Sequence, residues 1–416
     1  MTRKRILLAV LAFVLLLAAG AGAAWWWNER QTKDIRGSST QEFVTTDEPG
    51  TTTRPKREAV SIPWPQYGFD PARTRYAPDF HHQPPYGTRW SRPLQALIEF
   101  PPAVAYGRLY VANIHGKFVA LDVKSGKIDW QRDFDTCTAS SPAVRGRFVY
   151  QGLMNACSES HDNATGYLVA LDALTGRIRW RFKAGSVESS PLVVGNRVYF
   201  GSFDNRIHAL SAATGKQLWS FATDDNVKGA LAYANGTVYG GSYDGKVYAL
   251  DAESGKLRWS SAGQAGLRGA GNFYAGPAVA YGRVFVGNTD GKVYAFGAES
   301  GHLLWSHQTG KYVYSSAAVY RRTIYVGSYD RKVYALDAAT GDVRWTFSAN
   351  GAVSGSPTVI SGIVYFSSLQ GETYGLDAET GKVRWRFHRG RYTPVVADAK
   401  RLYVVALRRI YAMVDR

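Results

Sequence analysis

Val247-Tyr-Ala-Leu-Asp-Ala-Glu-Ser-Gly-Lys-Leu-Arg-Trp259 is the stretch that decides the fold, because it returns along the chain with small changes. The related stretches are Phe118–Trp130, Leu168–Trp180, Ile207–Trp219, Val293–Trp305, Val333–Trp345 and Thr373–Trp385. Their final tryptophans, together with Trp259, are 50, 39, 40, 46, 40 and 40 residues apart, and Trp90 stands 40 residues before the first. A period near forty residues predicts a repeat architecture.

Each repeat has the pattern of four short antiparallel strands, A to D. In Lys246-Val-Tyr-Ala-Leu the apolar side chains alternate, as in a half-buried strand. Asp251 to Gly255 is a turn, because the Asp carboxylate accepts nearby backbone amides and Gly tolerates positive φ. A second strand pair lies upstream, as in Ser189–Ser202, where Gly-Asn forms the connection. Four-stranded units at this period are the blades of a β-propeller.

The two ends of the repeat region predict one further blade. Seven repeats run from about Glu99 to Phe387, and three strands without a D strand follow, at Tyr392–Val396, Arg401–Val405 and Arg408–Met413. Gly87–Arg92, which contains Trp90, has the pattern of a D strand with no A to C before it. Pairing the two ends leaves no open edge in the ring. We therefore expect an all-β, eight-bladed β-propeller closed by N- and C-terminal strands.

The N-terminus predicts a membrane anchor. Three basic residues (3–5) precede a run of 19 uncharged residues from Ile6 to Ala24, and three tryptophans (25–27) follow. Such a run can span a hydrocarbon core of about 30 Å, and the basic start favours a cytoplasmic N-terminus. We expect residues 1–30 to be a cytoplasmic stub and a signal-anchor transmembrane helix, which makes the protein single-pass in the cell membrane with an extracytoplasmic propeller. A cleaved signal peptide is the alternative, because Ala19-Gly-Ala21 and Ala21-Gly-Ala23 fit a small-residue cleavage site.

The rest of the chain divides into a linker and one domain. Residues 31–63 are rich in Thr, Ser, Pro and charged residues and have little apolar clustering. Such a composition cannot bury a core and predicts a disordered tether. Residues 64–416 are expected to form the propeller, because repeats override the number of domains that a length of 416 residues suggests.

The two cysteines, Cys137 and Cys157, both lie in the second repeat. In an up-and-down blade the start of strand A and the B-to-C loop lie on the same face. Cys137 lies at the start of an A strand, and Cys157 lies in the B-to-C loop Leu153–Thr165. The pattern predicts a disulfide in an oxidising compartment. Two free thiols of a cytosolic protein are the alternative.

Two observations indicate a binding face. The long insertions, Leu153–Thr165 and Ala262–Gly271, fall on the same predicted face, which is where repeat proteins often carry a site, although functionless loops are the alternative. Aligning the A strands also places one residue of each blade near the mouth of the central channel, and these include Glu99, Glu188, Lys228, Tyr274, Tyr314 and Tyr392. Such a mixture of charges and aromatic rings suits a small-molecule or peptide site. The alternative is that these residues form no site, because the mouth of any propeller is polar where water enters it.

Charge and motifs restrict the chemistry. The net charge is +17, which for an exported protein favours lipid head groups or an anionic cell-surface polymer over nucleic acid, with simple solubility as the alternative. The common hydrolase, metalloprotease and dithiol motifs are missing from the sequence. Gly240 to Lys246 has the spacing of a phosphate-binding loop, but Val247 stands where Ser or Thr would bind magnesium.

The repeat Ala-Leu-Asp-Ala-x-[Ser/Thr]-Gly-Lys-x-x-Trp resembles the tryptophan-docking repeat of the pyrroloquinoline quinone (PQQ) propeller family. The stretch Trp64-Pro-Gln-Tyr-Gly-Phe-Asp-Pro-Ala-Arg-Thr-Arg75 resembles the lead-in of that family, so the resemblance covers residues 64–413. In such proteins tryptophans dock between neighbouring blades. The resemblance implies this role for Trp90, Trp130, Trp180, Trp219, Trp259, Trp305, Trp345 and Trp385.

The PQQ family has two branches with different functions. Quinoprotein dehydrogenases use PQQ with calcium and carry adjacent disulfide-bonded cysteines, whereas the cysteines here are twenty residues apart. The other branch resembles BamB, a non-enzymatic propeller of the outer-membrane assembly machinery. BamB-type proteins are lipid-anchored through an N-terminal cysteine, which this sequence does not contain before Cys137.

We interpret the protein as a BamB-like, non-enzymatic scaffold that binds envelope or membrane proteins, is monomeric and needs no cofactor. One alternative is an oxidoreductase or sensor that binds PQQ with calcium at an atypical site. Another is a cell-envelope polyanion binder.

Overall fold

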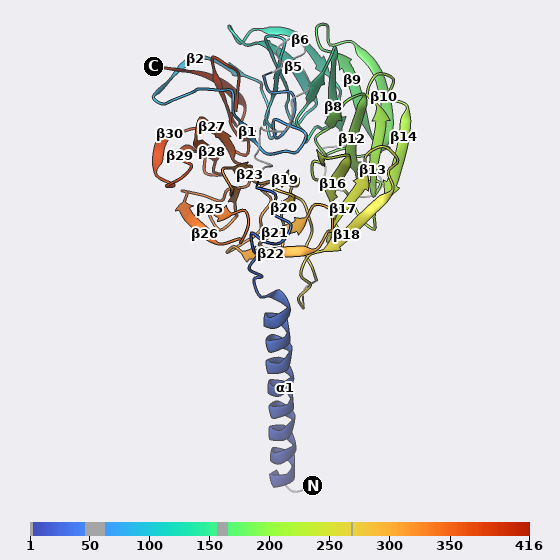
Figure 1. Cartoon of the computed structure of the whole chain (residues 1–416), viewed down its shortest axis with the longest axis vertical. Coiled ribbons are helices and arrows are strands. Elements are labelled where there is room, and N and C mark those ends of the chain that lie inside the picture. The colour runs from blue at the N-terminus through green and yellow to red at the C-terminus, as the bar shows by residue number, and fades with distance from the viewer. Residues whose placement is uncertain (1–2, 46–62, 156–164, 268) are drawn as a thin grey trace.

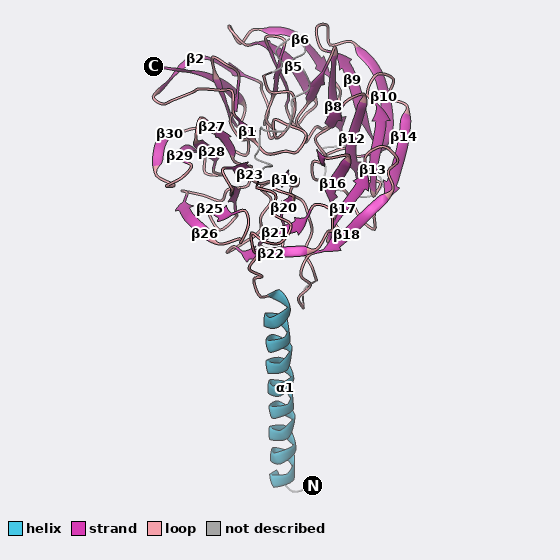
Figure 2. Ribbon diagram, in the orientation of Figure 1, coloured by secondary structure: helices cyan, strands magenta, loops and turns pink. Residues whose placement is uncertain are grey.

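The computed structural model describes residues 3–45, 63–155, 165–267 and 269–416. Within these residues the strands form eight sheets arranged around a central axis, and the helix α1 projects from one side (Figure 1). Figure 2 shows that strands make up almost all regular structure of the ring. The all-β, eight-bladed propeller predicted from the repeats is therefore confirmed.

Each of the first seven blades contains four consecutive antiparallel strands, A to D from the axis outward. Blades 1 to 4 are β3 (Ala103–Ala105), β4 (Arg108–Ala112), β5 (Lys117–Asp122), β6 (Ile128–Asp133); β7 (Ala143–Arg145), β8 (Phe148–Leu153), β9 (Thr165–Asp172), β10 (Ile178–Gly185); β11 (Leu192–Val194), β12 (Arg197–Ser202), β13 (Arg206–Ser211), β14 (Gln217–Ala222); and β15 (Ala232–Ala234), β16 (Thr237–Gly241), β17 (Lys246–Asp251), β18 (Leu257–Ala262). Blades 5 to 7 are β19 (Ala278–Ala280), β20 (Arg283–Gly287), β21 (Lys292–Gly297), β22 (Leu303–Gln308); β23 (Ala318–Tyr320), β24 (Thr323–Gly327), β25 (Lys332–Asp337), β26 (Val343–Ser348); and β27 (Thr358–Ile360), β28 (Ile363–Ser367), β29 (Thr373–Asp377), β30 (Val383–Phe387).

The turn of the repeat forms through its Asp and Gly. In blade 4 the Oδ1 atom of Asp251 accepts hydrogen bonds from the N–H and Oγ–H of Ser254, at 2.9 and 2.8 Å. Gly255 then has a φ of +72°, a conformation that costs other residues about 1 kcal/mol or more. On the strand before the turn, the pairing shifts by one residue at a bulge between Ala249 and Leu250, which sets the register of β18 on β17.

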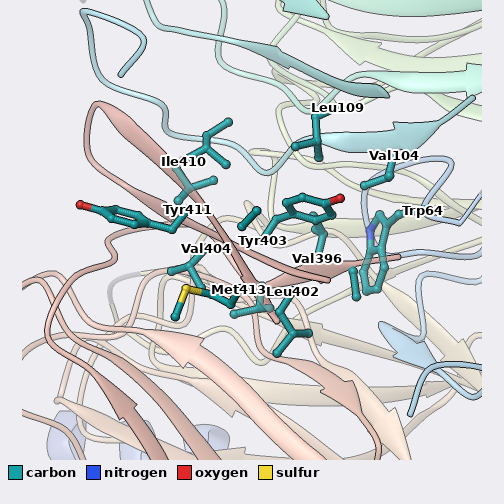
Figure 3. Packing of buried hydrophobic residues seen from close by; sticks show 14 of the residues in the cluster. Trp64, Val104, Leu109, Val396, Leu402, Tyr403, Val404, Ile410, Tyr411 and Met413 are labelled. Carbon is teal, nitrogen blue, oxygen red and sulfur yellow. The ribbon is translucent and has the colours of Figure 1, made fainter. Parts of the chain in front are cut away.

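Blade 8 joins the two ends of the ring as predicted. Its strands are β31 (Val396–Ala397), β32 (Leu402–Ala406), β33 (Arg409–Asp415) and, from the N-terminal side, β2 (Tyr86–Pro93), which pairs antiparallel with β33. Figure 3 shows the apolar cluster at this closure, in which Trp64 and, from β3, Val104 face Val396, Leu402 and Tyr403. Because β2 and β33 pair along their length, the ring has no open edge here.

Residues 64–77, which we call the inner belt, run along the innermost strands. Trp64 exchanges two backbone hydrogen bonds with Val104, and five later inner-strand residues donate N–H groups to successive belt carbonyls: Val144 to Pro65, Tyr233 to Pro71, Val279 to Ala72, Val319 to Thr74 and Val359 to Arg75. The belt ends as β1 (Tyr76–Ala77), parallel to β27. The lead-in of the repeat region therefore satisfies backbone donors at the inner edges of the blades.

Arg73 fixes the inner belt from inside the ring. Its side chain is fully buried, and its guanidinium donates to the carbonyls of Leu231 at 2.8 Å and Pro191 at 3.1 Å. Burial lowers the pKa of Arg73 to about 9. The belt thus contacts blades 3 and 4 through a side chain as well as through its backbone.

The helix α1 (Arg3–Thr32) corrects the predicted membrane anchor. Among the described residues, no helix combines the length and the apolar character that crossing a membrane requires. The last turns of α1 carry Asn28, Glu29 and Arg30, and the Asn28 side chain accepts the Leu267 N–H at 2.8 Å. The predicted single-pass helix, and the cell-membrane location inferred from it, are therefore wrong, and the polar C-terminal turn of α1 contacts the propeller instead.

Residues 33–45, which we call the strap, lie on the outside of blades 5 and 6. They belong to the stretch expected to be a disordered tether; the rest of that stretch, residues 46–62, lies outside the described residues. The Ile35 carbonyl accepts the N–H of Ser306 at 2.9 Å, and Gly37 donates its N–H to Thr340 at 3.0 Å. The strap is ordered because its backbone pairs with the outer strand β22 and with the next blade.

Candidate functional site: the channel mouth

The six predicted mouth residues occupy equivalent loops. Each lies between the outermost strand of one blade and the innermost strand of the next: Glu99 between β2 and β3, Glu188 between β10 and β11, Lys228 between β14 and β15, Tyr274 between β18 and β19, Tyr314 between β22 and β23, and Tyr392 between β30 and β31. Because the strands of a blade alternate in direction, all these D-to-A loops reach the same face of the ring, and the B-to-C turns join them there.

Glu188, Tyr274 and Lys228 form the polar centre of the mouth. The Tyr274 hydroxyl donates a hydrogen bond to Oε1 of Glu188 at 2.6 Å. The Lys228 ammonium lies 4.5 Å from the ring centroids of both Phe203 and Tyr243. A cation at this distance from aromatic faces is stabilised by the ring quadrupoles, so Lys228 is held beside the carboxylate without a direct ion pair.

Burial and neighbouring charge perturb the mouth acids. Burial raises the pKa of Glu188 to about 7, against the lowering effects of the Tyr274 hydrogen bond and the Lys228 charge. Burial also raises the pKa of Glu99, and the Glu99 charge in turn opposes ionisation of Glu188. Burial followed by the Glu188 charge raises the pKa of Tyr274 well above its ordinary value. The mouth therefore favours a protonated Tyr274 and a Glu188 that titrates near neutral pH.

Tyrosine rings extend from Tyr274 around the mouth. The ring centroids of Tyr274 and Tyr314 are 5.0 Å apart, and those of Tyr314 and Tyr329 are 5.1 Å apart, both edge to face. Tyr312, which is 52% exposed, packs against Tyr314 at 5.9 Å, and Tyr243 lies 6.3 Å from Tyr274. These five residues make a continuous aromatic surface, which we call the tyrosine arc.

Three members of the arc, Tyr243, Tyr312 and Tyr329, were not among the predicted residues. Two of them sit in B-to-C turns with the sequence Ser-Tyr-Asp, at 242–244 and 328–330, and the equivalent turn at 202–204 reads Ser-Phe-Asp. A repeated aromatic residue in a tight polar turn was the available signal. It was missed because only the A strands were aligned.

Glu99 and Tyr392 join the mouth more loosely than the other four. Glu99 acts through its charge on Glu188 and Tyr274. Tyr392 has a φ of +64°. Burial, followed by the charges of Tyr392 and Glu99, raises the pKa of Tyr329, whose hydroxyl donates to Ser354 at 3.2 Å. The structure thus brings Glu188, Lys228, Tyr274 and Tyr314 together and leaves Glu99 and Tyr392 at the edge.

The donor set of the mouth does not fit calcium. Calcium takes six to eight oxygen ligands, usually including several carboxylates. In the part of the chain that the structure describes, no group of three or more His, Cys, Asp or Glu side chains is placed to hold a metal ion. Glu188 is instead hydrogen-bonded to Tyr274 beside the cationic Lys228. We derive no quinone-dependent step from this arrangement.

Tryptophans with equivalent positions contact the seams between blades. Seven of the eight named tryptophans donate their indole N–H to a carbonyl of the following blade, at 2.9–3.1 Å: Trp90 to Val123, Trp130 to Ala173, Trp180 to Ala212, Trp219 to Ala252, Trp259 to Ala298, Trp305 to Ala338 and Trp345 to Ala378. The eighth, Trp385, stacks on Phe387 and meets Tyr86 edge to face.

The C-to-D turn glycine of the next blade lies on the indole face. A Cβ atom added to Gly301 would stand 2.6 Å from the ring of Trp259, and the same relation holds for Gly255 and Trp219. The repeat therefore needs Gly for two reasons, positive φ and contact with the ring.

The predicted cysteine pair and insertions are described in part. Cys137 is buried, and its carbonyl accepts the N–H of Met154 at 2.8 Å, at the start of the loop that contains Cys157. Cys157 and most of that loop lie outside the described residues, so the disulfide stays a prediction. In the other insertion, the Gln264 side chain donates to the carbonyls of Gln31 and Lys33 at the end of α1. This insertion contacts the chain's own N-terminal segment.

Comparison with known proteins places the repeats in a family. A family model described as outer membrane protein assembly factor BamB matches residues 87–163, 163–230 and 204–405. The BamB of Shigella dysenteriae is 30% identical over 128 residues, which are 29% of this chain and 31% of that protein. The aligned region therefore spans about a third of the length of that relative.

Solved structures share the fold at lower identity. BamB from Moraxella catarrhalis superposes with a TM-score of 0.63 at 20% identity, covering 80% of this chain and 98% of that one. Quinohemoprotein alcohol dehydrogenase from Comamonas testosteroni gives a TM-score of 0.68 at 14% identity, covering 84% and 80%. Both solved structures thus share the propeller fold, and the family model covers most of the chain. The protein belongs to the PQQ-repeat β-propeller family described as outer membrane protein assembly factor BamB.

Proposed function

We propose that the protein is a non-enzymatic scaffold that binds another protein at the channel mouth. The observation that carries this proposal is the tyrosine arc, which loops and turns of several blades assemble beside Glu188 and Lys228. Loops placed on a rigid β framework are the usual position of binding residues. The scaffold holds them without a helix or domain that could close over the mouth in the described ring.

Tyrosine suits a protein-binding surface for physical reasons. Each ring offers a large contact area, loses little conformational entropy on binding and keeps a hydroxyl for hydrogen bonds. Tyr312 is 52% exposed, whereas Tyr274 is hydrogen-bonded to Glu188 below it. The arc therefore presents ring faces to a partner, while the hydroxyls of Tyr274 and Tyr329 are already hydrogen-bonded.

The name of the relatives supports this class of partner. The relatives are called outer membrane protein assembly factors, and we propose that the partner here is a protein of such an assembly. Glu99 and Glu188 in the mouth disfavour a polyanion at this place, despite the net charge of +17. Added salt is expected to weaken such a polyanion contact steeply, but to weaken binding at the tyrosine arc little.

The experiment places a photo-crosslinking amino acid at position 312 and, as a matched control, at position 257 on an outer strand, where Leu257 is 48% exposed. We expect one discrete protein adduct from position 312, which weakens when Tyr314→Ala is added and does not form from position 257. Identical adducts from both positions would contradict the proposal.

A second titration addresses the dehydrogenase branch. PQQ with calcium is titrated into the full chain, and tryptophan fluorescence and heat are measured. We expect no saturable site. Saturable binding at one site per chain, lost in Glu188→Gln, would favour the oxidoreductase and replace the scaffold proposal.

A further inference from the structure

The strap shows how a seam between two blades binds an extended chain. Arg283, the first residue of β20, is fully buried and donates to strap carbonyls: its Nη2 atom contacts the carbonyls of Ser38 and Gln41 at 2.6 Å each. Nη1 donates to the carbonyls of Ala338 and Ala339 in the next blade. One guanidinium thus joins blade 5, blade 6 and the main chain of the strap.

Apolar contacts complete this seam. The Phe43 ring stacks on Tyr281 with centroids 5.3 Å apart, and the guanidinium groups of Arg283 and Arg322 lie 5.0 and 5.1 Å from its centroid. Val44 donates its N–H to the Tyr281 carbonyl at 3.0 Å. Main-chain carbonyls, the Phe43 ring and the Glu42 carboxylate, which accepts the Ser300 hydroxyl at 2.6 Å, are therefore what this seam recognises in the strap.

The seam between blades 3 and 4 has the same frame. Arg197 is the first residue of β12, as Arg283 is of β20. Trp219 donates to the Ala252 carbonyl, as Trp305 does to that of Ala338. Counting from these alanines, Glu253 corresponds to Ala339, and Arg197 Nη1 indeed donates to the Glu253 carbonyl at 3.2 Å.

No strap covers this second seam in the described chain. A groove of about 540 Å³ lies there, lined by residues that include Arg197, Leu218 and Glu253. Leu218 is 45% exposed, whereas its counterpart Leu304 at the strap seam is 7% exposed. This difference in exposure is what we would expect if an extended chain such as the strap were removed from the seam, because the leucine beneath it would become exposed.

The Glu253 side chain occupies the place that the strap carbonyls take at the seam between blades 5 and 6. Its carboxylate pairs with Nη2 of Arg197, the atom that in Arg283 binds the strap. The Glu253 side chain is 82% exposed, and an exposed pair of this kind contributes little free energy. An incoming segment can therefore displace the carboxylate at small cost.

We propose that the seam groove between blades 3 and 4 binds an extended segment of a partner protein, whose main-chain carbonyls replace the Glu253 carboxylate on Arg197. An aromatic side chain of the segment lies where Phe43 lies in the strap. At the counterparts of Tyr281 and Arg322 the groove has Gly195 and Gly236, around which a Cβ atom would meet at most one atom within 4 Å. The groove therefore has room for a ring larger than that of Phe43, beside the guanidinium of Arg258.

This site is separate from the channel mouth. The groove is formed by an A-to-B turn and a C-to-D turn, which lie on the face opposite to the D-to-A loops. A scaffold with both sites can hold two segments at once. The seam proposal does not depend on the proposed function of the mouth.

The test uses a fluorescein-labelled peptide with the sequence of residues 36–44 and measures its binding to the full chain by fluorescence anisotropy. We expect saturable binding that Arg197→Gln weakens at least about tenfold, because charge-assisted hydrogen bonds to the carbonyls are lost. Glu253→Ala recreates the residue at the strap seam and is expected to tighten binding several-fold. Arg321→Gln, which removes an exposed arginine of another seam, serves as the control and leaves the affinity unchanged.

Three outcomes overturn the proposal. The first is a peptide affinity that neither Arg197→Gln nor Glu253→Ala changes. The second is a photo-crosslink from the Phe43 position of the peptide to Tyr281 rather than to residues 194–197 of the groove, which means that the peptide only replaces the chain's own strap. The third is dimerisation of the full chain that Arg197→Gln abolishes, which assigns the groove to the strap of a second copy.

Discussion

The contact between Trp259 and Gly301 gives the sharpest test of how the blades are held together. Trp259 is 9% exposed and donates to the Ala298 carbonyl at 3.0 Å. Burying an aromatic side chain of this size removes about 200 Å² from water, which at about 25 cal/mol per Å² is about 5 kcal/mol. Trp259→Ala is expected to lower the free energy of unfolding by about 3–5 kcal/mol.

The lost hydrogen bond adds little to this figure. The Ala298 carbonyl also accepts the Tyr239 hydroxyl at 3.1 Å, so it keeps a partner after the substitution. With an unfolding entropy of about 2.1 cal/mol/K per residue over about 350 residues, the melting temperature should fall by about 4–7 °C. Differential scanning calorimetry measures both the shift and the enthalpy.

A double-mutant cycle isolates the contact itself. Gly301→Ala places a Cβ atom 2.6 Å from the indole at a φ of +73°, and should destabilise the wild type by more than the strain of about 1 kcal/mol that positive φ imposes on Ala. In the Trp259→Ala background the clash disappears and the strain remains. A coupling of about 1 kcal/mol or more is expected. Equal costs of Gly301→Ala in both backgrounds, or an unchanged melting temperature in Trp259→Ala, would refute the reasoning.

Three further predictions concern the mouth, the cysteines and the strap. Burial raises the pKa of Glu188 from 4.5 to about 7, so the folded state binds this proton more tightly, and the resulting stability is lost as the pH rises from about 4.5 to 7. In thermal melts between about pH 5 and 8, the free energy of unfolding of Glu188→Gln should therefore rise relative to that of the wild type by up to about 3 kcal/mol. Stability curves of the two proteins that stay parallel over this pH range would exclude the shift. Non-reducing peptide mapping should recover Cys137 linked to Cys157, whereas alkylation of both without reductant would rule out the disulfide. Arg283→Ala removes the donors to the strap carbonyls, so tryptic cleavage after Arg36 should become several-fold faster, and an unchanged rate would contradict the strap contacts.

The fold could be predicted because its determinants are local and repeated. The Asp, Gly and Trp of each unit specify a turn, a positive φ and a seam contact within about a dozen residues, and the period gives the number of blades. The strand pattern also predicted the closure of the ring, because the D strand around Trp90 had no A to C strands before it and the C-terminal strands had no D strand after them. Local signals of this kind need no knowledge of the distant partner.

The candidate mouth was predictable only in part. Aligned A strands identified Glu188, Lys228 and Tyr274, because equivalent loops of a repeat reach equivalent places. Tyr243 and Tyr329 entered from B-to-C turns, and their ring contacts depend on how neighbouring blades are angled. Composition misled at the N-terminus, where uncharged residues predicted a membrane span and polar residues predicted a free tether that includes the packed residues 33–45.

The blade, the number of blades and the closure follow from the sequence alone, because a hydrophobic pattern with period two and a turn signal act over neighbouring residues. The positions of single segments across the ring depend instead on long-range contacts of the folded chain. The strap reaches Arg283 over more than 240 residues of chain, and Arg75 of the inner belt pairs with Val359. Such contacts use backbone carbonyls, which every residue carries, and therefore leave no pattern of side chains to be read in advance.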